Sequence, residues 1–316
     1  MLSRTTSQTD AAIGDIASDN VSGAAEILRL AAAIFSLLND ELTNQASLSA
    51  SLSIEEAQQS VRKTCTALAK AQPDMSSLLR LASEALSAAR AEAAGREALK
   101  SAADAARRFL ESATHSAHAA AMHAVSLIRD GSSVLTHSRS STVLEALIEA
   151  RRAAKHFEVI ATESRPMFEG RRLASELSAR GINVTVIADA AASLFIGRAD
   201  LILVGADKIT PEHVVNKIGT RMIALAARER GLPIYALCDT SKFIAADYLA
   251  VICDQRNASE LWPDAPAEVA VVNSYFEPTP LTYFTGVFTE LGVLSGKDAS
   301  MFAGKACIDP ILLEAL

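Results

Sequence analysis

The chain has 316 residues, of which 50% are hydrophobic, 21% charged and only 5% aromatic, and its formal net charge is −7 at pH 7. This composition is typical of a soluble globular protein and excludes a collagen-like or wholly disordered chain. Acidic residues outnumber basic ones 15 to 12 in residues 1–130 and 22 to 18 in the remainder, so we expect no nucleic-acid partner.

The cysteines and the apolar stretches indicate where the protein resides. Its four cysteines form no CxxC pair and are too few for a disulfide scaffold, which favours a reducing, intracellular setting. The start of the chain lacks the apolar core of a signal peptide, and the longest apolar stretch, residues 30–38, is too short to span a membrane. We therefore expect a cytoplasmic protein without a membrane partner.

Residues 1–130 are predicted to form a helical N-terminal domain. Between Gly23 and Gly131 the only helix breakers are Pro73 and Gly95, and alanine, leucine, glutamate and arginine dominate. Helices are expected to begin near residues 22–23, 53–56 and 73–74, and residues 91–129 are expected to hold one or two long helices.

Residues 131–316 follow a different pattern, in which short runs rich in valine and isoleucine alternate with amphipathic segments. This alternation predicts an α/β domain, a parallel sheet with helices on both faces. The predicted strands are residues 133–136, 157–162, 183–188, 201–205, 233–238, 249–253 and 268–272. Two predicted helices, residues 168–180 and 216–230, end at Gly181 and Gly231, and the helix after the first strand is expected to begin at Val143 with Thr142 and Glu145 as a capping box.

Charged and hydroxyl residues follow most of the predicted strands. Because ligands of an open parallel sheet bind beyond the carboxyl ends of its strands, we expect these residues to converge on one site. Arg139, Arg165, Lys217 and Lys242, with several serines and helix N-termini, would form an anion pocket. Carboxylates follow three strands, as Asp189, Asp207 and Asp239, and in such a pocket they would bind sugar hydroxyls or transfer a proton. The alternative for each residue singly is an ordinary polar loop.

Other site types find little support. No GxGxxG follows a strand, and residues 292–298 lack the spacing of a P-loop, so a dinucleotide enzyme or P-loop NTPase is not expected, and no cofactor is implied. His115 and His118 share a helix face, but no carboxylate completes a metal site convincingly, so packing or surface roles are favoured and no metal is expected. Cys238 stands at a strand end, where apolar neighbours favour a buried, inert thiol over a nucleophile.

Several segments, in order, resemble one known family. They are VGADKITPEHVVNKIGTRMIALAARERGLPIYALCDTSKF at 204–243, ESRPMFEGRRLASEL at 163–177, EPTPLTYFTGVFTELGVL at 277–294 and the stretch GSSVLTHSRSSTVLEAL at 131–147. They are similar to blocks of the family that unites the alpha, beta and delta subunits of translation initiation factor 2B with ribose-1,5-bisphosphate isomerase and methylthioribose-1-phosphate isomerase.

The resemblance implies a helical N-terminal domain, residues 1–130, and a Rossmann-like ligand-binding domain, residues 131–316. It also implies a homo-oligomer, a dimer or larger, which binds a phosphorylated sugar or a nucleoside monophosphate at the strand ends. The isomerases of this family use a cysteine after the first strand and an aspartate in the Gly-Ala-Asp block. The aspartate corresponds to Asp207, and Asn216 and Lys217 follow it as in the family.

Two positions depart from the isomerase pattern. Ser138 stands where the isomerases have cysteine, beside His137. A thiol with a pKa near ~8.5 can exchange protons in a buried site, whereas a serine hydroxyl needs a neighbouring base. Near Gly23 the isomerases place an arginine beside the glycine, and this chain has Asn20, Val21 and Ser22 in those places.

Two functions from different classes, and a third possibility, fit these residues. The first is a regulatory protein that binds a phosphorylated sugar or nucleotide without turnover, with Gly23, His137, Arg139, Arg165, Asn216, Lys217 and Lys242 in the binding site. The second is an aldose-ketose isomerase in which Ser138 replaces the cysteine and Asp207 moves the proton. The third is an assembly subunit with a vestigial site.

Overall fold

The computed structural model describes residues 7–19, 22–46, 52–245 and 256–316. These residues form two compact units, residues 1–114 with 307–316 and residues 115–306, which are described separately here as unit 1 and unit 2. Helix α5 begins in unit 1 and ends in unit 2. The division between the units after Thr114 therefore lies within α5, before the change of sequence pattern at Gly131.

Unit 1 is helical, as its alanine-rich sequence predicted. Its helices are α1 (Gln8–Ser18), α2 (Ala24–Ala46), α3 (Ile54–Ala71), α4 (Ser76–Arg90), the first part of α5 (Gly95–Val125) and α11 (Pro310–Ala315). Ser53 and Glu56 form a full capping box at the start of α3, so this predicted helix start is confirmed. The C-terminal α11 packs against α3 and buries Leu312. None of the helices in the described part of the chain has the length and apolarity that a membrane crossing requires.

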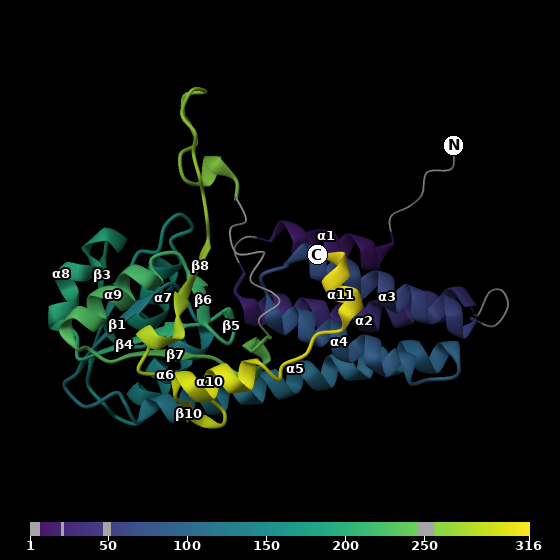
Figure 1. The fold of residues 1–316 in the computed structure, drawn as a ribbon, viewed down its shortest axis with the longest axis horizontal. Helices are drawn as coiled ribbons and strands as arrows, with labels where there is room; N and C mark the ends of the chain where they lie inside the picture. The colour runs from purple at the N-terminus through teal and green to yellow at the C-terminus, as the bar shows by residue number, and fades with distance from the viewer. Residues whose placement is uncertain (1–6, 20–21, 47–51, 246–255) are drawn as a thin grey trace. The chain divides into compact units, whose positions relative to one another are not determined.

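Unit 2 contains a mostly parallel sheet of seven strands in the order β10-β9-β7-β4-β1-β2-β3. The strands are β1 (Ser133–His137), β2 (Glu158–Thr162), β3 (Asn183–Ile187), β4 (Leu201–Gly205), β7 (Ile234–Leu237), β9 (Gly286–Thr289) and β10 (Gly292–Leu294). Only β10 runs antiparallel to its neighbour. The predicted α/β class with a parallel sheet is confirmed (Figure 1).

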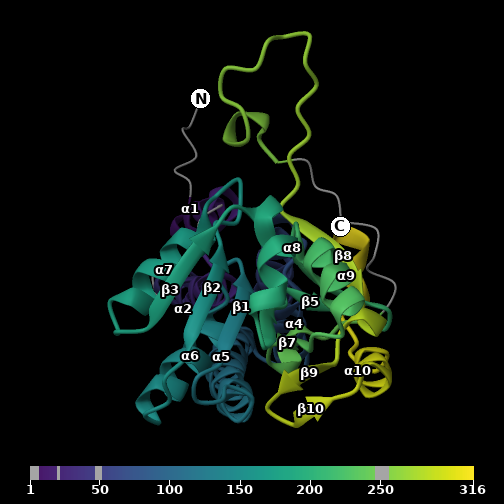
Figure 2. The same ribbon diagram turned by 90° about the vertical axis from the view of Figure 1, so that its left-hand side faces the viewer.

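Alternating side chains of the buried strands form an apolar core on each face of this sheet. On one face Val134 and Val159 pack with residues of α5, α6 (Ser141–Arg152) and α7 (Glu169–Ser178). On the other face Leu135 and Ile202 pack with residues of α8 (Ala192–Phe195), α9 (Thr220–Arg230) and α10 (Gly296–Ala303). Helices thus cover both faces, as Figure 2 shows.

A second, antiparallel sheet of three strands lies within unit 2 and was not predicted. It consists of β5 (Lys208–Ile209), β6 (His213–Lys217) and β8 (Phe276–Pro280). Because β6 ends at Lys217, the predicted helix over residues 216–230 is wrong in its first four residues, and α9 begins at Thr220. The left-handed Gly219, with φ of 105°, separates strand from helix.

Other element predictions have mixed outcomes. Helix α9 ends at the left-handed Gly231 as predicted. Helix α6 begins at Ser141 because Ser140, rather than Thr142, caps its N-terminus by accepting from the Val143 amide. Residues 268–272 form no strand, and the predicted strand at 249–253 lies outside the described residues.

Candidate functional site

The order of the strands identifies where a ligand would bind. From β1 the chain adds β2 and β3 on one side and then returns to add β4 on the other side. The carboxyl ends of β1 and β4 therefore flank a topological switch point, which is the usual ligand position in open α/β sheets. His137 pairs with Val204 at this edge, so Ser138 and Asp207 both follow strands that end side by side.

The N-terminus of α6 lies at the same edge. A Cβ added to Gly205 would come within 2.6 Å of Ser140 Cβ, so only glycine allows β4 to end this close to the helix cap. The amides of Ser141 and Thr142 precede the first intrahelical hydrogen bonds and remain available to an anion. The helix N-terminus expected from the sequence is therefore present at the switch point.

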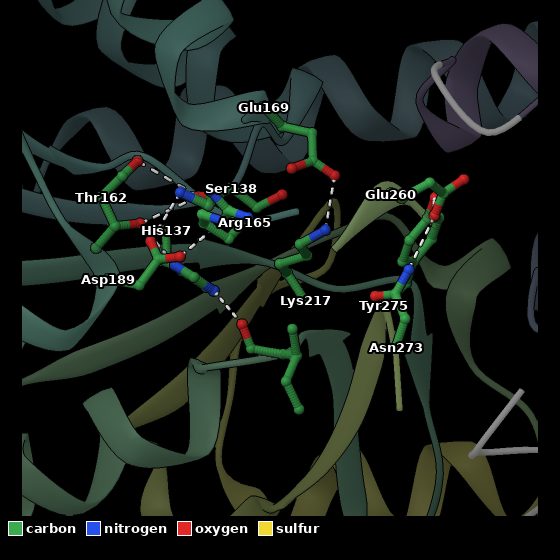
Figure 3. Close-up of polar contacts among 12 residues, drawn as sticks. His137, Ser138, Thr162, Arg165, Glu169, Asp189, Lys217, Glu260, Asn273 and Tyr275 are labelled. Carbon is green, nitrogen blue, oxygen red and sulfur yellow. Dashed lines mark hydrogen bonds and ion pairs between the residues drawn. The ribbon is translucent and has the colours of Figure 1, made fainter. Parts of the chain in front are cut away.

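His137 is the centre of a buried hydrogen-bond chain. Its side chain ends β1 and is only 1% exposed. Its Nε2 lies 2.8 Å from the carbonyl oxygen of Ile218, and its Nδ1 lies 2.6 Å from Thr162 Oγ1 (Figure 3). Because a carbonyl only accepts, Nε2 carries the proton and Nδ1 accepts from Thr162. Burial lowers the pKa of His137, so the ring is neutral at pH 7.

The same chain of hydrogen bonds continues to Ser138. Thr162 Oγ1 lies 3.1 Å from Ser164 Oγ, and Ser164 Oγ accepts the backbone N–H of Ser138 at 2.8 Å. Both serines have positive φ, 65° and 63°. Such left-handed backbone is costly for a residue with a Cβ, so these hydrogen bonds hold a strained turn in place.

Asp189 holds the neighbouring loop in place. Its two carboxylate oxygens accept the backbone N–H groups of Ser164 and Arg165, each at 2.7 Å. The carboxylate predicted to meet a sugar hydroxyl or a proton is thus used to shape the loop after β2. The alternative of a structural loop residue fits Asp189 better.

The two arginines expected to bind an anion have partners of their own. Arg139 forms a two-point ion pair with Glu176 on α7, at 2.6 and 3.0 Å, and this hydrogen bonding lowers the pKa of Glu176. Arg165 is exposed, and its guanidinium donates to the carbonyl oxygen of Leu261 at 3.2 Å. Both still lie in loops at the sheet edge.

Asn216 and Lys217 reach the site from the end of β6. Asn216 donates to Thr220 Oγ1 at 3.0 Å, and Lys217 Nζ lies 2.9 Å from Glu169 Oε1. The Lys217 side chain is only 3% exposed, so this is a largely buried ion pair. The second oxygen of Glu169, Oε2, is buried with no hydrogen-bond partner among the described residues.

The backbone next to Lys217 connects it to the first strand. Ile218 supplies the carbonyl that accepts from His137, and a Cβ on Gly219 would lie 3.1 Å from the His137 ring. Glu277 Oε1 accepts the amides of Gly219 and Arg221. The N-terminus of α9 is therefore already capped by a carboxylate.

The remaining predicted residues occupy different positions. Asp207 is half-buried between β4 and β5 and donates its backbone N–H to Val215. Lys242 is buried in a 3-10 turn, residues 240–242, next to a bridge between Ile209 and Phe243. Gly23 is an exposed residue at the start of α2 in unit 1.

Cys238 fits the reading of an inert thiol. It is buried, and burial raises its pKa well above the usual range. Among the described residues no group of three or more histidine, cysteine, aspartate or glutamate side chains is arranged to hold a metal ion. His118 instead pairs with Glu145 at 2.6 Å.

Sequence reasoning missed several residues that shape the site: Thr162, Glu169, Tyr275 and Glu277. Thr162 ends a strand that was predicted correctly, so its position at the carboxyl edge was a usable signal. Glu169 stands at the start of a predicted helix, where a carboxylate is ordinarily read as a response to the helix dipole. Tyr275 and Glu277 precede and enter β8, which was not predicted at all.

Comparison with known proteins points to one family. A model described as the initiation factor 2 subunit family matches residues 7–296. Ribose 1,5-bisphosphate isomerase of Archaeoglobus fulgidus is 40% identical over 172 residues, which cover 53% of this chain and 55% of that protein. Methylthioribose-1-phosphate isomerase of Geobacter metallireducens is 35% identical over 195 residues, 55% of this chain and 56% of that protein.

The similarity to solved structures extends over more of the chain. The structure of translation initiation factor eIF-2B from Pyrococcus horikoshii matches with a TM-score of 0.79 and 31% identity, covering 91% of this chain and 96% of that one. By sequence, in contrast, the match spans little more than half the length of the two isomerases.

Proposed function

Because the chain belongs to the initiation factor 2 subunit family, we propose that it binds a phosphorylated sugar or a nucleoside monophosphate at the switch point of its sheet. We propose further that it does so as a regulatory protein, without converting the ligand. Binding and turnover depend on different groups, so each part of the proposal is argued from its own residues.

The hydrogen bonding of the His137 ring is the observation that supports binding without turnover. A serine hydroxyl becomes a proton-transfer group only with a base in hydrogen-bond reach, and His137 is the base adjacent to Ser138. One of its ring nitrogens donates to a carbonyl and the other accepts from Thr162. Among the described residues Ser138 makes hydrogen bonds through its backbone only. Nothing in this arrangement raises the acidity of the Ser138 hydroxyl.

The binding part rests on the groups gathered around Lys217. An ammonium has three N–H donors, and Glu169 accepts one of them. In the proposed complex a phosphate accepts from Lys217 and from the amides that begin α6, while Asn216 and Lys242 complete its contacts. Arg139 and Arg165 add positive potential at the edge.

Glu169 favours a hydroxyl-bearing ligand over a bare phosphate. A buried carboxylate oxygen without a donor is costly, and Glu169 Oε2 is in that situation. A sugar hydroxyl placed there would donate to it. Asp207, at the end of β4, offers a second acceptor for the same sugar.

Isomerisation is the second candidate function, with Asp207 as the proton-transfer group and Ser138 in place of cysteine. It is favoured by the adjacent ends of β1 and β4, which bring these two residues to one edge. If it is correct, Asp207→Asn abolishes the conversion of a bound aldose phosphate. Unchanged turnover in that variant would exclude this mechanism.

We propose that the protein acts as a homo-oligomer in the cytoplasm. Large apolar side chains remain exposed on the described part of unit 2, among them Leu291, Val293 and Met301, which supports burial against another copy. Light scattering of the purified protein distinguishes a dimer or larger assembly from a monomer.

A thermal-shift screen tests the ligand. Ribose 1,5-bisphosphate, methylthioribose 1-phosphate, AMP and a hexose phosphate are added to the wild-type chain, to Lys217→Met and to Arg152→Met. Arg152 is a surface residue that pairs with Glu149 on its own helix, so its variant is the matched control. We expect a saturable shift with the wild type and the control and none with Lys217→Met. No shift with any of these ligands would contradict the proposed binding.

A further inference from the structure

Residues 256–274 form an extended surface arm that leads into β8. Apart from a short 3-10 turn at Ala258–Glu260, the arm has no regular secondary structure. Figures 1 and 2 both show it as a light-green loop that extends away from the sheet of unit 2. Its apolar side chains are exposed, with Trp262 at 47% and Val272 at 62%.

Polar contacts, centred on the buried Asn273, hold the two ends of this arm together at its base. Asn273, only 2% exposed, donates to the carbonyl oxygen of Asn257 and to Glu260 Oε2, both at 2.9 Å. The Tyr275 hydroxyl donates to the same Glu260 oxygen. The backbone N–H of Arg256 donates to the Asn273 carbonyl at 2.8 Å. One carboxylate oxygen thus joins the two ends of the arm.

The Tyr275 ring connects this base to the candidate site. Lys217 Nζ lies 4.8 Å from the ring centroid, and Arg256 Cζ lies 5.1 Å from it. The Tyr275 carbonyl accepts the Ile218 amide at 2.8 Å. Figure 3 shows Lys217 between Glu169 on one side and Tyr275 on the other. Any displacement of the ammonium therefore changes a cation–π contact as well as an ion pair.

A second contact joins the arm to the loop after β2. Arg165 donates to the carbonyl oxygen of Leu261, one residue before Trp262. The backbone of Arg165 is fixed by Asp189. The arm thus contacts two residues at the sheet edge, Lys217 through Tyr275 and Arg165 directly.

We propose that Tyr275 positions Lys217 for ligand binding and thereby couples occupancy of the site to the conformation of the arm. This inference rests on the proposed function, since the coupling concerns a ligand at Lys217. The Lys217 ammonium lies between Glu169 and the Tyr275 ring. A phosphate that accepts from this ammonium attracts it and changes both contacts. Coupling between two sites is reciprocal. If ligand binding shifts the equilibrium between two conformations of the arm, a variant that shifts this equilibrium also changes the affinity for the ligand.

Tyr275→Phe is the discriminating variant, because it removes the hydroxyl bound by Glu260 and keeps the ring beside Lys217. Burial and the hydrogen bond to Glu260 raise the pKa of Tyr275, so the wild-type hydroxyl stays protonated and donates. Tyr283→Phe is the matched control, since the Tyr283 ring lies against Arg228 instead. Glu260→Gln is a second variant that weakens the same contact.

Two readouts are measured with ribose 1,5-bisphosphate as the probe. Calorimetry gives its dissociation constant, and acrylamide quenching of Trp262, the only tryptophan of the chain, reports on the arm. We expect the ligand to reduce quenching in the wild type. We expect Tyr275→Phe and Glu260→Gln to raise the dissociation constant about fivefold and to weaken the effect of the ligand on quenching. Tyr283→Phe is expected to behave as the wild type.

Binding with no effect on Trp262, and with equal affinity in Tyr275→Phe, would overturn the coupling and leave the proposed function standing. If neither ribose 1,5-bisphosphate nor any other ligand of the thermal-shift screen binds the wild type, that result would instead contradict the proposed function. In that case ligand-free proteins still test the coupling, because Lys217→Met is expected to increase Trp262 quenching and the surface variant Arg152→Met is not. Equal quenching in these two variants would overturn the inference by itself.

Discussion

The buried neutral His137 predicts a specific dependence of stability on pH. Burial lowers the pKa of its ring below the ordinary value of 6.5, whereas the unfolded chain keeps a value near 6.5. Protons therefore bind the unfolded state first as the pH falls. The stability that His137 contributes is complete above pH 6.5 and is lost as the pH falls from 6.5 towards the folded pKa. Within this window the slope is up to about 1.4 kcal/mol per pH unit.

Urea unfolding of the wild type, His137→Gln and His156→Gln at several pH values between about 5 and 7.5 measures this slope. His156 is the control because its side chain is 76% exposed. We expect the free energy of unfolding to change less with pH in His137→Gln than in the wild type. The difference in slope corresponds to the uptake of up to one proton on unfolding. In His156→Gln we expect the slope of the wild type. The absolute stability of His137→Gln also falls, since two buried hydrogen bonds are lost, but only the slope tests the argument.

Equal slopes for all three proteins would refute the reasoning about His137. A folded-state pKa at or above 6.5, from the pH dependence of the His137 ring proton signals, would do so as well. The histidine would then be able to take a proton near pH 7, and the case against activation of Ser138 would lose its basis.

Three further predictions follow from the described contacts. Removing the α9 cap by Glu277→Ala is expected to lower the free energy of unfolding by about 1–3 kcal/mol, because two amides lose their acceptor, and an unchanged urea midpoint would contradict it. Ser53→Ala, which removes the capping box with Glu56, is expected to cost about 1 kcal/mol in the same assay. Iodoacetamide is expected to modify the exposed Cys307 in the native protein and Cys238 only after unfolding, which peptide mass spectrometry determines.

Much of the fold could be predicted because its main determinants are local. Buried parallel strands appear as short runs of β-branched residues, and the sequence predicted all five strands from β1 to β7 in the large sheet. The strands β5 and β6 of the small sheet were not predicted. Residues 213–217 form a strand that only Ile218 and Gly219 separate from the helix at residues 220–230. The helical pattern of residues 220–230 therefore led to a helix prediction that also covered Asn216 and Lys217.

The residue types at the site could be predicted, but their partners could not. Arg139 was expected to bind an anion, and it pairs with Glu176, 37 positions away. Lys217 pairs with Glu169 across 48 positions. Such pairs depend on how α7 packs beside the sheet edge, which no local pattern records. The placement of Ser138 next to a base already in use could likewise be known only from the structure.

The central claim is that this site binds a phosphorylated sugar without converting it. Calorimetric titration with ribose 1,5-bisphosphate, followed by ³¹P NMR of the same mixture, measures both parts at once. The account predicts saturable binding to the wild type, none to Lys217→Met, and no new phosphorus signal after prolonged incubation. A phosphorus signal of the ketose that the wild type produces and Lys217→Met does not, or the absence of saturable binding, would contradict it.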